Sequence, residues 1–138
     1  MTRNDETELP TPKPVHWIAS SKRDLRRFPK SVRRTVGKAL QSAQIGEKHP
    51  RAKPLNGFGG AGVLEVVDSN DGNTYRAVYT VKFTGVVCVL HVYQKKSKSG
   101  SSTPVHEIEK IRSRLVLAEN DYAEWTEQQE WEEGQEPR

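Results

Sequence analysis

Apolar residues recur along this chain at two different spacings, which predict helices first and strands later. A short apolar stretch, Val15 to Ala19, is typical of a first strand. Ser21 and Asp24 then have the spacing of a capping box, which predicts a short helix that Pro29 interrupts. A second helix is predicted up to Gly46, with apolar positions at Val32, Val36, Ala39, Leu40 and Ala43.

The middle of the chain changes to the alternating pattern of strands. Lys48 to Gly62 is a connection rich in proline and glycine. Turns at Asn70-Asp71-Gly72 and Thr84-Gly85 separate three predicted strands: Val63 to Val67, Thr74 to Phe83 and Val86 to Lys95. Strands joined by turns this short form an antiparallel meander.

A final helix is predicted after Thr103-Pro104, because threonine suits a helix cap and proline suits the first helical turn. Its apolar positions are Ile108, Ile111, Leu115, Ala118, Tyr122 and Trp125. The order of elements predicts an α+β fold, with an N-terminal strand and a helical hairpin packed on one face of an antiparallel sheet, followed by a C-terminal helix. The other face of the sheet is then expected to be free for function.

Charge divides the chain into unequal parts. We expect a linker or disordered arm over 1–14, one folded domain over 15–118, and an acidic tail over 119–138 into which the last helix can continue. Residues 13–118 contain 20 Lys and Arg against 7 Asp and Glu, whereas residues 119–138 contain eight acids and one base. A basic domain attracts polyanions, because neutralising phosphates releases condensed counterions. Charge alone does not distinguish RNA from DNA or from an acidic protein, and a merely solvated basic surface is the alternative.

Hydropathy and residue content exclude several classes of protein. The longest apolar run, Val86 to Leu90, is far short of the roughly 20 residues that span a membrane, and no apolar signal region is visible. We therefore expect a cytoplasmic protein without a membrane partner. The single cysteine, Cys88, excludes an internal disulfide, and the dispersed histidines predict no metal site. Gly57 to Gly62 matches a dinucleotide-binding pattern but precedes a strand rather than a helix, so no cofactor is predicted.

Alternation along the strands predicts which side chains share the free face, because residues two apart point the same way. In the last strand, the expected core residues are Cys88, Leu90 and Val92. In the two preceding strands they are Leu64, Val66, Tyr75, Ala77, Tyr79, Val81 and Phe83. The free face is then expected to carry Glu65, Arg76, Lys82, His91, Tyr93 and Lys95.

These side chains are of the types needed to cleave RNA without a metal, through attack of a ribose 2′-hydroxyl on the neighbouring phosphate. The reaction needs a proton acceptor, for which Glu65 or His91 is suitable, and cations near the phosphorane, for which Arg76 and Lys95 are suitable. Tyr93 can stack on a base or donate a hydrogen bond. Further RNA contacts are predicted for Lys53, Lys82, Lys96 and Lys98. Ordinary polar positions on a half-solvated sheet are the alternative.

Several motifs, taken in order, resemble the phage-derived branch of the RelE/HigB toxin superfamily. They are Lys53-Pro-Leu-Asn-Gly57, Gly62-Val-Leu-Glu-Val66, Thr74-Tyr-Arg-Ala-Val-Tyr79, Val89-Leu-His-Val-Tyr-Gln-Lys-Lys-Ser97 and Thr103-Pro104. The resemblance implies the toxin of a toxin-antitoxin pair, a ribosome-dependent endoribonuclease that cuts mRNA and is neutralised by a helix-turn-helix antitoxin of the HigA type. It also implies that Arg76 is the active-site arginine and that Lys95 and Lys96 are the basic positions closing the last strand.

One strand departs from this resemblance. Prototype RelE proteins carry two lysines at the positions that match Glu65 and Val67 here. Their lysine-based proton transfer does not carry over, so Glu65 or His91 is the expected base, unless phosphate stabilisation dominates. Two non-catalytic functions remain open: a ParE-like gyrase inhibitor, and a protein that binds only its antitoxin or nucleic acid. The acidic tail could also fold over the basic face.

Overall fold

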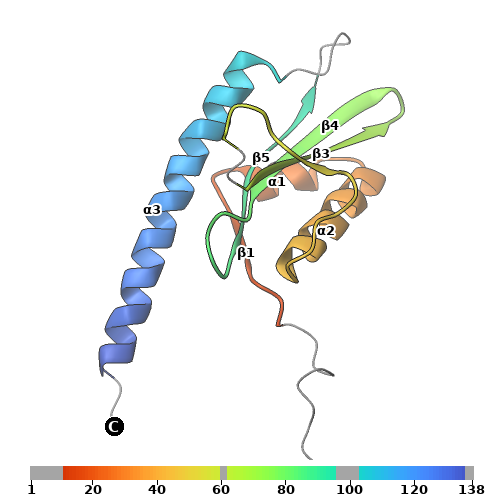
Figure 1. The fold of residues 1–138 in the computed structure, drawn as a ribbon. Coiled ribbons are helices and arrows are strands. Elements are labelled where there is room, and N and C mark those ends of the chain that lie inside the picture. The colour runs from red at the N-terminus through yellow and green to blue at the C-terminus, as the bar shows by residue number, and fades with distance from the viewer. Residues whose placement is uncertain (1–10, 60–61, 96–102, 136–138) are drawn as a thin grey trace, which may run out of the picture.

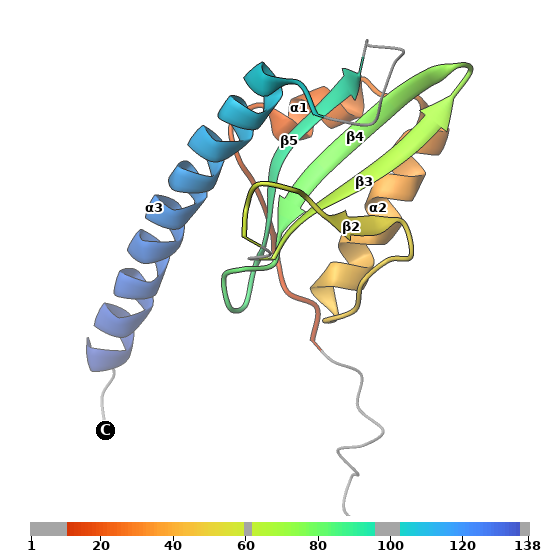
Figure 2. The ribbon, with the colours of Figure 1, turned by 45° about the horizontal axis from the view of Figure 1, so that its top comes forward.

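The structure is a computed structural model that describes residues 11–59, 62–95 and 103–135. It contains one sheet with helices on both of its faces (Figures 1 and 2). The strands are β1 (Val15–Trp17), β2 (Ala52–Pro54), β3 (Val63–Asn70), β4 (Asn73–Thr80) and β5 (Val87–Lys95). The helices are α1 (Ser21–Arg26), α2 (Lys30–Gln44) and α3 (Val105–Gln135). The α+β architecture predicted from the order of elements is therefore confirmed.

The strands lie in the order β1-β5-β4-β3-β2. β3, β4 and β5 form the predicted antiparallel meander, and β1 lies at the edge of the sheet, parallel to β5. Asp71 and Gly72 both have positive φ, as a tight hairpin turn between twisted strands requires. β2 lies in the connection that we expected to be a loop. This strand was not predicted from the sequence because 3 residues are too few to show alternation.

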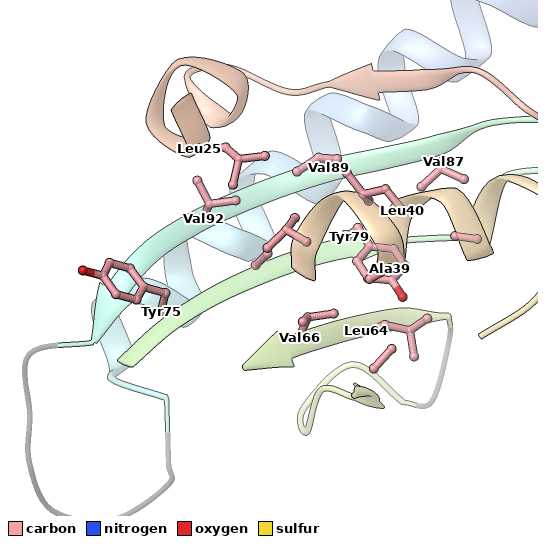
Figure 3. Packing of buried hydrophobic residues seen from close by; sticks show 14 of the residues in the cluster. Leu25, Ala39, Leu40, Leu64, Val66, Tyr75, Tyr79, Val87, Val89 and Val92 are labelled. Carbon is pink, nitrogen blue, oxygen red and sulfur yellow. The ribbon is translucent and has the colours of Figure 1, made fainter. Parts of the chain in front are cut away.

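The helical hairpin covers one face of the sheet and buries the larger apolar cluster (Figure 3). All five apolar positions predicted for α2 are buried. They pack against strand residues of the same face: Leu64, Val66, Tyr75, Ala77, Tyr79, Val87, Val89 and Val92. Fully burying one such aliphatic side chain contributes roughly 1.5–3 kcal/mol, so this layer is a main source of stability.

α3 covers part of the opposite face, which the sequence predicted to be free. Ile111 and Ala118 of α3 are fully buried and belong to a second apolar cluster with Val78 and Leu90. The first half of α3 runs beside β5, and its second half extends past the sheet (Figures 1 and 2). The prediction of a free face is wrong because the apolar side of α3 needs a surface of its own to pack against.

Among the described residues, no helix is apolar enough over a sufficient length to cross a bilayer.

A β-bulge in β5 changes which side chains share a face. Neighbouring residues of β4 pair with His91 and Val89, so Leu90 is an extra residue in the ladder. Cys88 and Leu90 therefore lie in the cluster beneath α3, whereas Val92 lies in the cluster beneath α2. The prediction that Cys88, Leu90 and Val92 share one face is wrong, because strict alternation fails at the bulge.

Two local predictions are also wrong. Val81 and Phe83 do not continue the inward set of β4, because the strand ends at Thr80; Val81 is exposed and Phe83 joins the cluster beneath α3. The capping box does not form at the start of α1. The Ser21 hydroxyl is buried there and donates to the carbonyl oxygen of Val89 on β5, so it is not available to a helix N–H.

The two ends of the chain differ in how they are held. Residues 1–10 of the expected arm lie outside the described residues. Further along, the N–H of Lys13 donates to the carbonyl oxygen of Gln44, and the Gln44 side chain donates back to the carbonyl oxygen of Lys13. At the other end α3 continues to Gln135, so the acidic residues from Glu119 up to that point are part of a helix.

Substituting Ile111 tests whether α3 is part of the folded core. We expect Ile111→Ala to lower the free energy of unfolding by about 2–5 kcal/mol, since it leaves a cavity at a fully buried position. Val116→Ala, at an exposed position of the same helix, is the control and should change it by less than about 0.5 kcal/mol. Urea denaturation followed by circular dichroism measures both, and equal effects would contradict the packing of α3.

Candidate active site

Five of the six side chains predicted to share a functional face lie together, in rows of strand-paired residues. From β2 to β5, the first row consists of Lys53, Glu65, Val78 and His91. The second row consists of Val67, Arg76 and Tyr93, and Lys95 lies beyond it, opposite Thr74. Directly paired residues of neighbouring strands share a face, so β3, β4 and β5 all contribute to one site.

Four of these side chains are buried, although the sequence predicted a free face. The exposed fractions are 5% for Arg76, 4% for His91, 7% for Tyr93 and 7% for Lys95. Taking an ionised group out of water costs several kcal/mol unless it is paired and hydrogen-bonded. The partners of these groups therefore decide what each one can do.

Arg76 and Glu65 form an ion pair between neighbouring strands. Nη1 of Arg76 donates to Oε2 of Glu65 across 3.1 Å, and the two side chains are 6% and 13% exposed. Among the described residues, Nε of Arg76 has no hydrogen-bond acceptor. A buried donor without an acceptor costs about 1–3 kcal/mol, so an incoming anion would relieve a real penalty here.

Tyr93 adds a second donor next to Arg76, its partner in the strand register. Within the described part of the chain its buried hydroxyl has no partner in good hydrogen-bond geometry, although the Thr103 side chain lies close enough to lower its pKa. Burial, and then the negative charge of Glu65, raise the pKa of Tyr93 to about 12. The hydroxyl is therefore protonated at neutral pH and can donate. Arg76 and Tyr93 together offer two donors to one anionic group.

A depression in the surface leads to the Glu65 side of the site. Its volume is about 340 Å³, and it is lined by Pro50, Arg51, Lys53, Glu65 and Val67. Lys53 is exposed and pairs in register with Glu65, so the lining of the depression includes a cation next to the Glu65 position. This arrangement suits a ligand that carries several negative charges.

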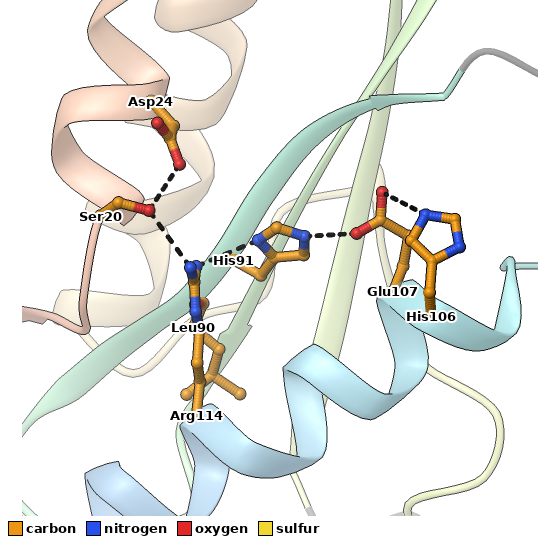
Figure 4. A network of polar contacts seen from close by, with 7 residues as sticks. All are labelled: Ser20, Asp24, Leu90, His91, His106, Glu107 and Arg114. Atoms are coloured by element: carbon orange, nitrogen blue, oxygen red, sulfur yellow. Dashed lines mark hydrogen bonds and ion pairs between the residues drawn. The ribbon is translucent and has the colours of Figure 1, made fainter.

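His91 has both ring nitrogens engaged and is held by α3 (Figure 4). Nε2 of His91 lies 2.7 Å from Oε1 of Glu107, and Nδ1 lies 3.1 Å from Nη1 of Arg114. A guanidinium can only donate, so Nδ1 accepts from Arg114 and Nε2–H donates to Glu107. Burial, the largest effect, lowers the pKa of His91, which favours this neutral form. Glu65 is therefore better placed than His91 to accept a proton from a ligand.

Glu107 and Arg114 were not predicted from the sequence. They are 7 residues apart on α3, on the side that also carries Ile111, so helical periodicity could have placed them beside β5. Lys82 is separate from the site, because β4 has already ended and its Nζ donates to Glu119 of α3 across 3.2 Å. The predicted RNA contacts Lys96 and Lys98 lie outside the described residues.

In the part of the chain that the structure describes, no group of three or more His, Cys, Asp or Glu side chains has the arrangement of a metal site. Glu65 and Tyr93 carry groups that can exchange a proton, and the cations Arg76 and Lys95 lie on the same face. Such a set can bind an anion and move a proton.

The lowered pKa of His91 predicts how stability depends on pH. In the unfolded chain the His91 imidazole takes up a proton below about pH 6.5, whereas in the folded chain it does so only at lower pH. The free energy of unfolding therefore falls as the pH drops below about 6.5, by at most about 1.4 kcal/mol per pH unit. Urea denaturation at pH 7.5 and 5.5 measures the loss, which should shrink in His91→Gln. His49→Gln, in the loop before β2, is the control and should keep the wild-type loss; an undiminished loss in His91→Gln would refute the assignment.

Comparison with known proteins identifies the family. A search of curated proteins finds no match. Among solved structures, the chain is similar to a free double arginine-to-alanine mutant of the E. coli toxin RelE, with 18% identity, a TM-score of 0.49 and coverage of 78% of this chain and 98% of that one. It is also similar to the RelBE2 toxin-antitoxin complex of Mycobacterium tuberculosis, with 23% identity, a TM-score of 0.41 and coverage of 62% and 94%. The sequence pattern of one family matches residues 23–116, which is more than half of the chain, and this protein therefore belongs to the phage derived protein Gp49-like (DUF891) family.

Proposed function

We propose that this protein is the toxin of a toxin-antitoxin pair and that it cleaves RNA without a metal. The observation that carries the proposal is the pair of unsatisfied buried donors, Nε of Arg76 and the hydroxyl of Tyr93, next to the Glu65 carboxylate. A phosphodiester is an anion that accepts several hydrogen bonds, and Arg binds it in a planar, directional manner. The site therefore suits a phosphate whose neighbouring hydroxyl faces Glu65.

In this reaction Glu65 accepts the proton of the ribose 2′-hydroxyl as the 2′-oxygen forms a bond to the adjacent phosphorus. The bond from phosphorus to the 5′-oxygen then breaks, which leaves a 2′,3′-cyclic phosphate on one product and a 5′-hydroxyl on the other. Tyr93 donates a hydrogen bond to the departing 5′-oxygen, which takes up a proton from water or Tyr93. Arg76 and Lys95 stabilise the extra negative charge of the phosphorane, and Lys53 holds the adjoining backbone.

The same proposal includes the partners and the place of action. The motifs that resemble the HigB-like branch support mRNA on the ribosome as the substrate, a helix-turn-helix antitoxin of the HigA type as the inhibitor, and the cytoplasm as the compartment. The glutamate at position 65 supports a HigB-like rather than a prototype RelE site. The net positive charge of the folded part supports an RNA partner.

Burial of the site favours a second candidate function, that of a non-catalytic binder. Arg76 and Tyr93 are at most 7% exposed, so a long RNA strand reaches them only if the surface around them opens. A ParE-like inhibitor of gyrase, or a protein that binds only its antitoxin or nucleic acid, needs no such access. The two functions predict different outcomes on expression.

Inducible expression with mapping of mRNA 5′ ends tests the nuclease. We expect growth arrest with cuts inside translated codons, and a loss of cutting by about 10²–10³-fold in Arg76→Ala, since a group that stabilises the phosphorane is removed. Glu65→Gln should also cut less, because an amide does not accept the proton. Arg27→Ala, at an exposed position on the far face of the sheet, is the matched control and should cut like the wild type.

The remaining outcomes decide against cleavage. Arrest with intact mRNA and altered DNA supercoiling would indicate a gyrase inhibitor. Equal cutting by the wild type and Arg76→Ala would remove this site from the reaction. Absence of arrest together with retained binding of antitoxin would indicate a binder.

A further inference from the structure

We infer that Arg114 of α3 is a positioning residue that orients Tyr93 by holding His91 in one tautomer. The contacts that support this inference do not depend on the reaction, whereas its effect on cleavage rests on the proposed function. No sequence motif pointed to Arg114. It lies on the helix that was expected only to complete the fold.

Arg114 uses one guanidinium nitrogen to hold two neighbouring groups of the bulge. Its Nη1 lies 3.1 Å from the carbonyl oxygen of Leu90 and 3.1 Å from Nδ1 of His91. The bulge leaves Leu90 without a paired residue in β4, and Arg114 supplies a donor to its carbonyl oxygen. The same nitrogen obliges Nδ1 of His91 to be an acceptor, because Arg has no lone pair to offer.

The guanidinium is itself anchored from α1 (Figure 4). Its Nη2 donates to Oγ of Ser20 across 3.2 Å, and that hydroxyl donates onward to Oδ2 of Asp24 across 2.7 Å. Figure 4 shows the resulting line of contacts, from Asp24 through Arg114 and His91 to Glu107. Elements far apart in the sequence therefore fix a single imidazole.

His91 passes this orientation to Tyr93 by stacking. The two ring centroids are 5.0 Å apart and the ring planes differ by 17°. Tyr93 pairs in register with Arg76, so the angle of its ring decides where its hydroxyl lies relative to the guanidinium that binds the proposed phosphate. Without Arg114 the His91 imidazole can flip or take up a proton, and the Tyr93 ring stacked on it is then no longer held in one orientation.

The charges around His91 give the inference a readout of its own. From α3, Arg114 and Lys110 lower the pKa of His91, whereas the hydrogen bond and the charge of Glu107 raise it. β5 contributes the uncharged ring of Tyr93, β4 contributes the apolar Val78, and α1 contributes Asp24, which acts on Arg114. Removing Arg114 and removing Glu107 should therefore shift the pKa of His91 in opposite directions.

We would test this with the full chain by ¹⁵N NMR of the histidine side chains over a pH titration. In the wild type, His91 should be neutral at pH 7 with its proton on Nε2. Arg114→Met should raise the pKa of His91, and Glu107→Gln should lower it. A residue that only stabilised the fold would not produce shifts of opposite sign. Arg112→Met is the matched control, because Arg112 binds the carbonyl oxygen of Gly57 and the Phe58 ring, and should leave His91 unchanged.

Arg114→Lys keeps a cation that can only donate, so it should restore both the Nε2–H tautomer and the lowered pKa. It also serves as the informative variant if Arg114→Met does not fold. In the 5′-end mapping assay, Arg114→Met should cut about tenfold to a hundredfold less than the wild type, as expected for a misplaced reacting group, and Arg114→Lys should recover most of the loss.

The titration tests the role of Arg114, and the cutting assay tests the proposed function. If the wild type cuts no RNA, the proposed function is refuted, while the titration still decides whether Arg114 holds the tautomer. An unchanged His91 titration in Arg114→Met, a proton on Nδ1 in the wild type, or the same shift in Arg112→Met would each overturn the inference.

Discussion

The β-bulge at Leu90 decides which side chains of β5 face α3. One extra residue in β5 reverses the alternation of side chains, so that Cys88 and Leu90 pack beneath α3 while His91 and Tyr93 join the face that carries Arg76. A regular strand cannot place both pairs there, because with His91 and Tyr93 opposite Val78 and Arg76 the side chains of Cys88 and Leu90 would face α2. The irregularity therefore lets one strand contribute both to the core beneath α3 and to the candidate site, and Arg114 donates to the Leu90 carbonyl oxygen.

Burial gives the site its electrostatic character. Arg76 and Glu65 are paired in a region from which water is largely excluded, where charge–charge interactions are strong and an unpaired donor is costly. Such a site is well organised for an anion and poorly accessible to a large one. The organisation of the site for an anion favours cleavage of RNA, whereas its poor accessibility favours simple binding. Both properties come from the same contacts.

α3 contributes to the site as well as to the fold. Its apolar residues pack on the face of the sheet opposite α2. On the same side of the helix, Glu107 and Arg114 contact the two ring nitrogens of His91. The acidic second half of the helix does not lie over the site, and Glu119 pairs with Lys82 at the end of β4. Changes in the packing of α3 would thus reach the imidazole directly.

Local patterns in the chain were enough to predict the order of elements, the meander and five of the side chains that share one face of the sheet. Periods of two and of three to four residues follow from local backbone geometry, so α2, the β3–β4 turn and the grouping of Glu65, Arg76, His91, Tyr93 and Lys95 could be read from the chain. The bulge, the second layer formed by α3 and the depth at which the site is buried could be seen only in the folded protein. These depend on contacts between residues far apart in sequence, such as Arg114 with Ser20, to which no local pattern responds.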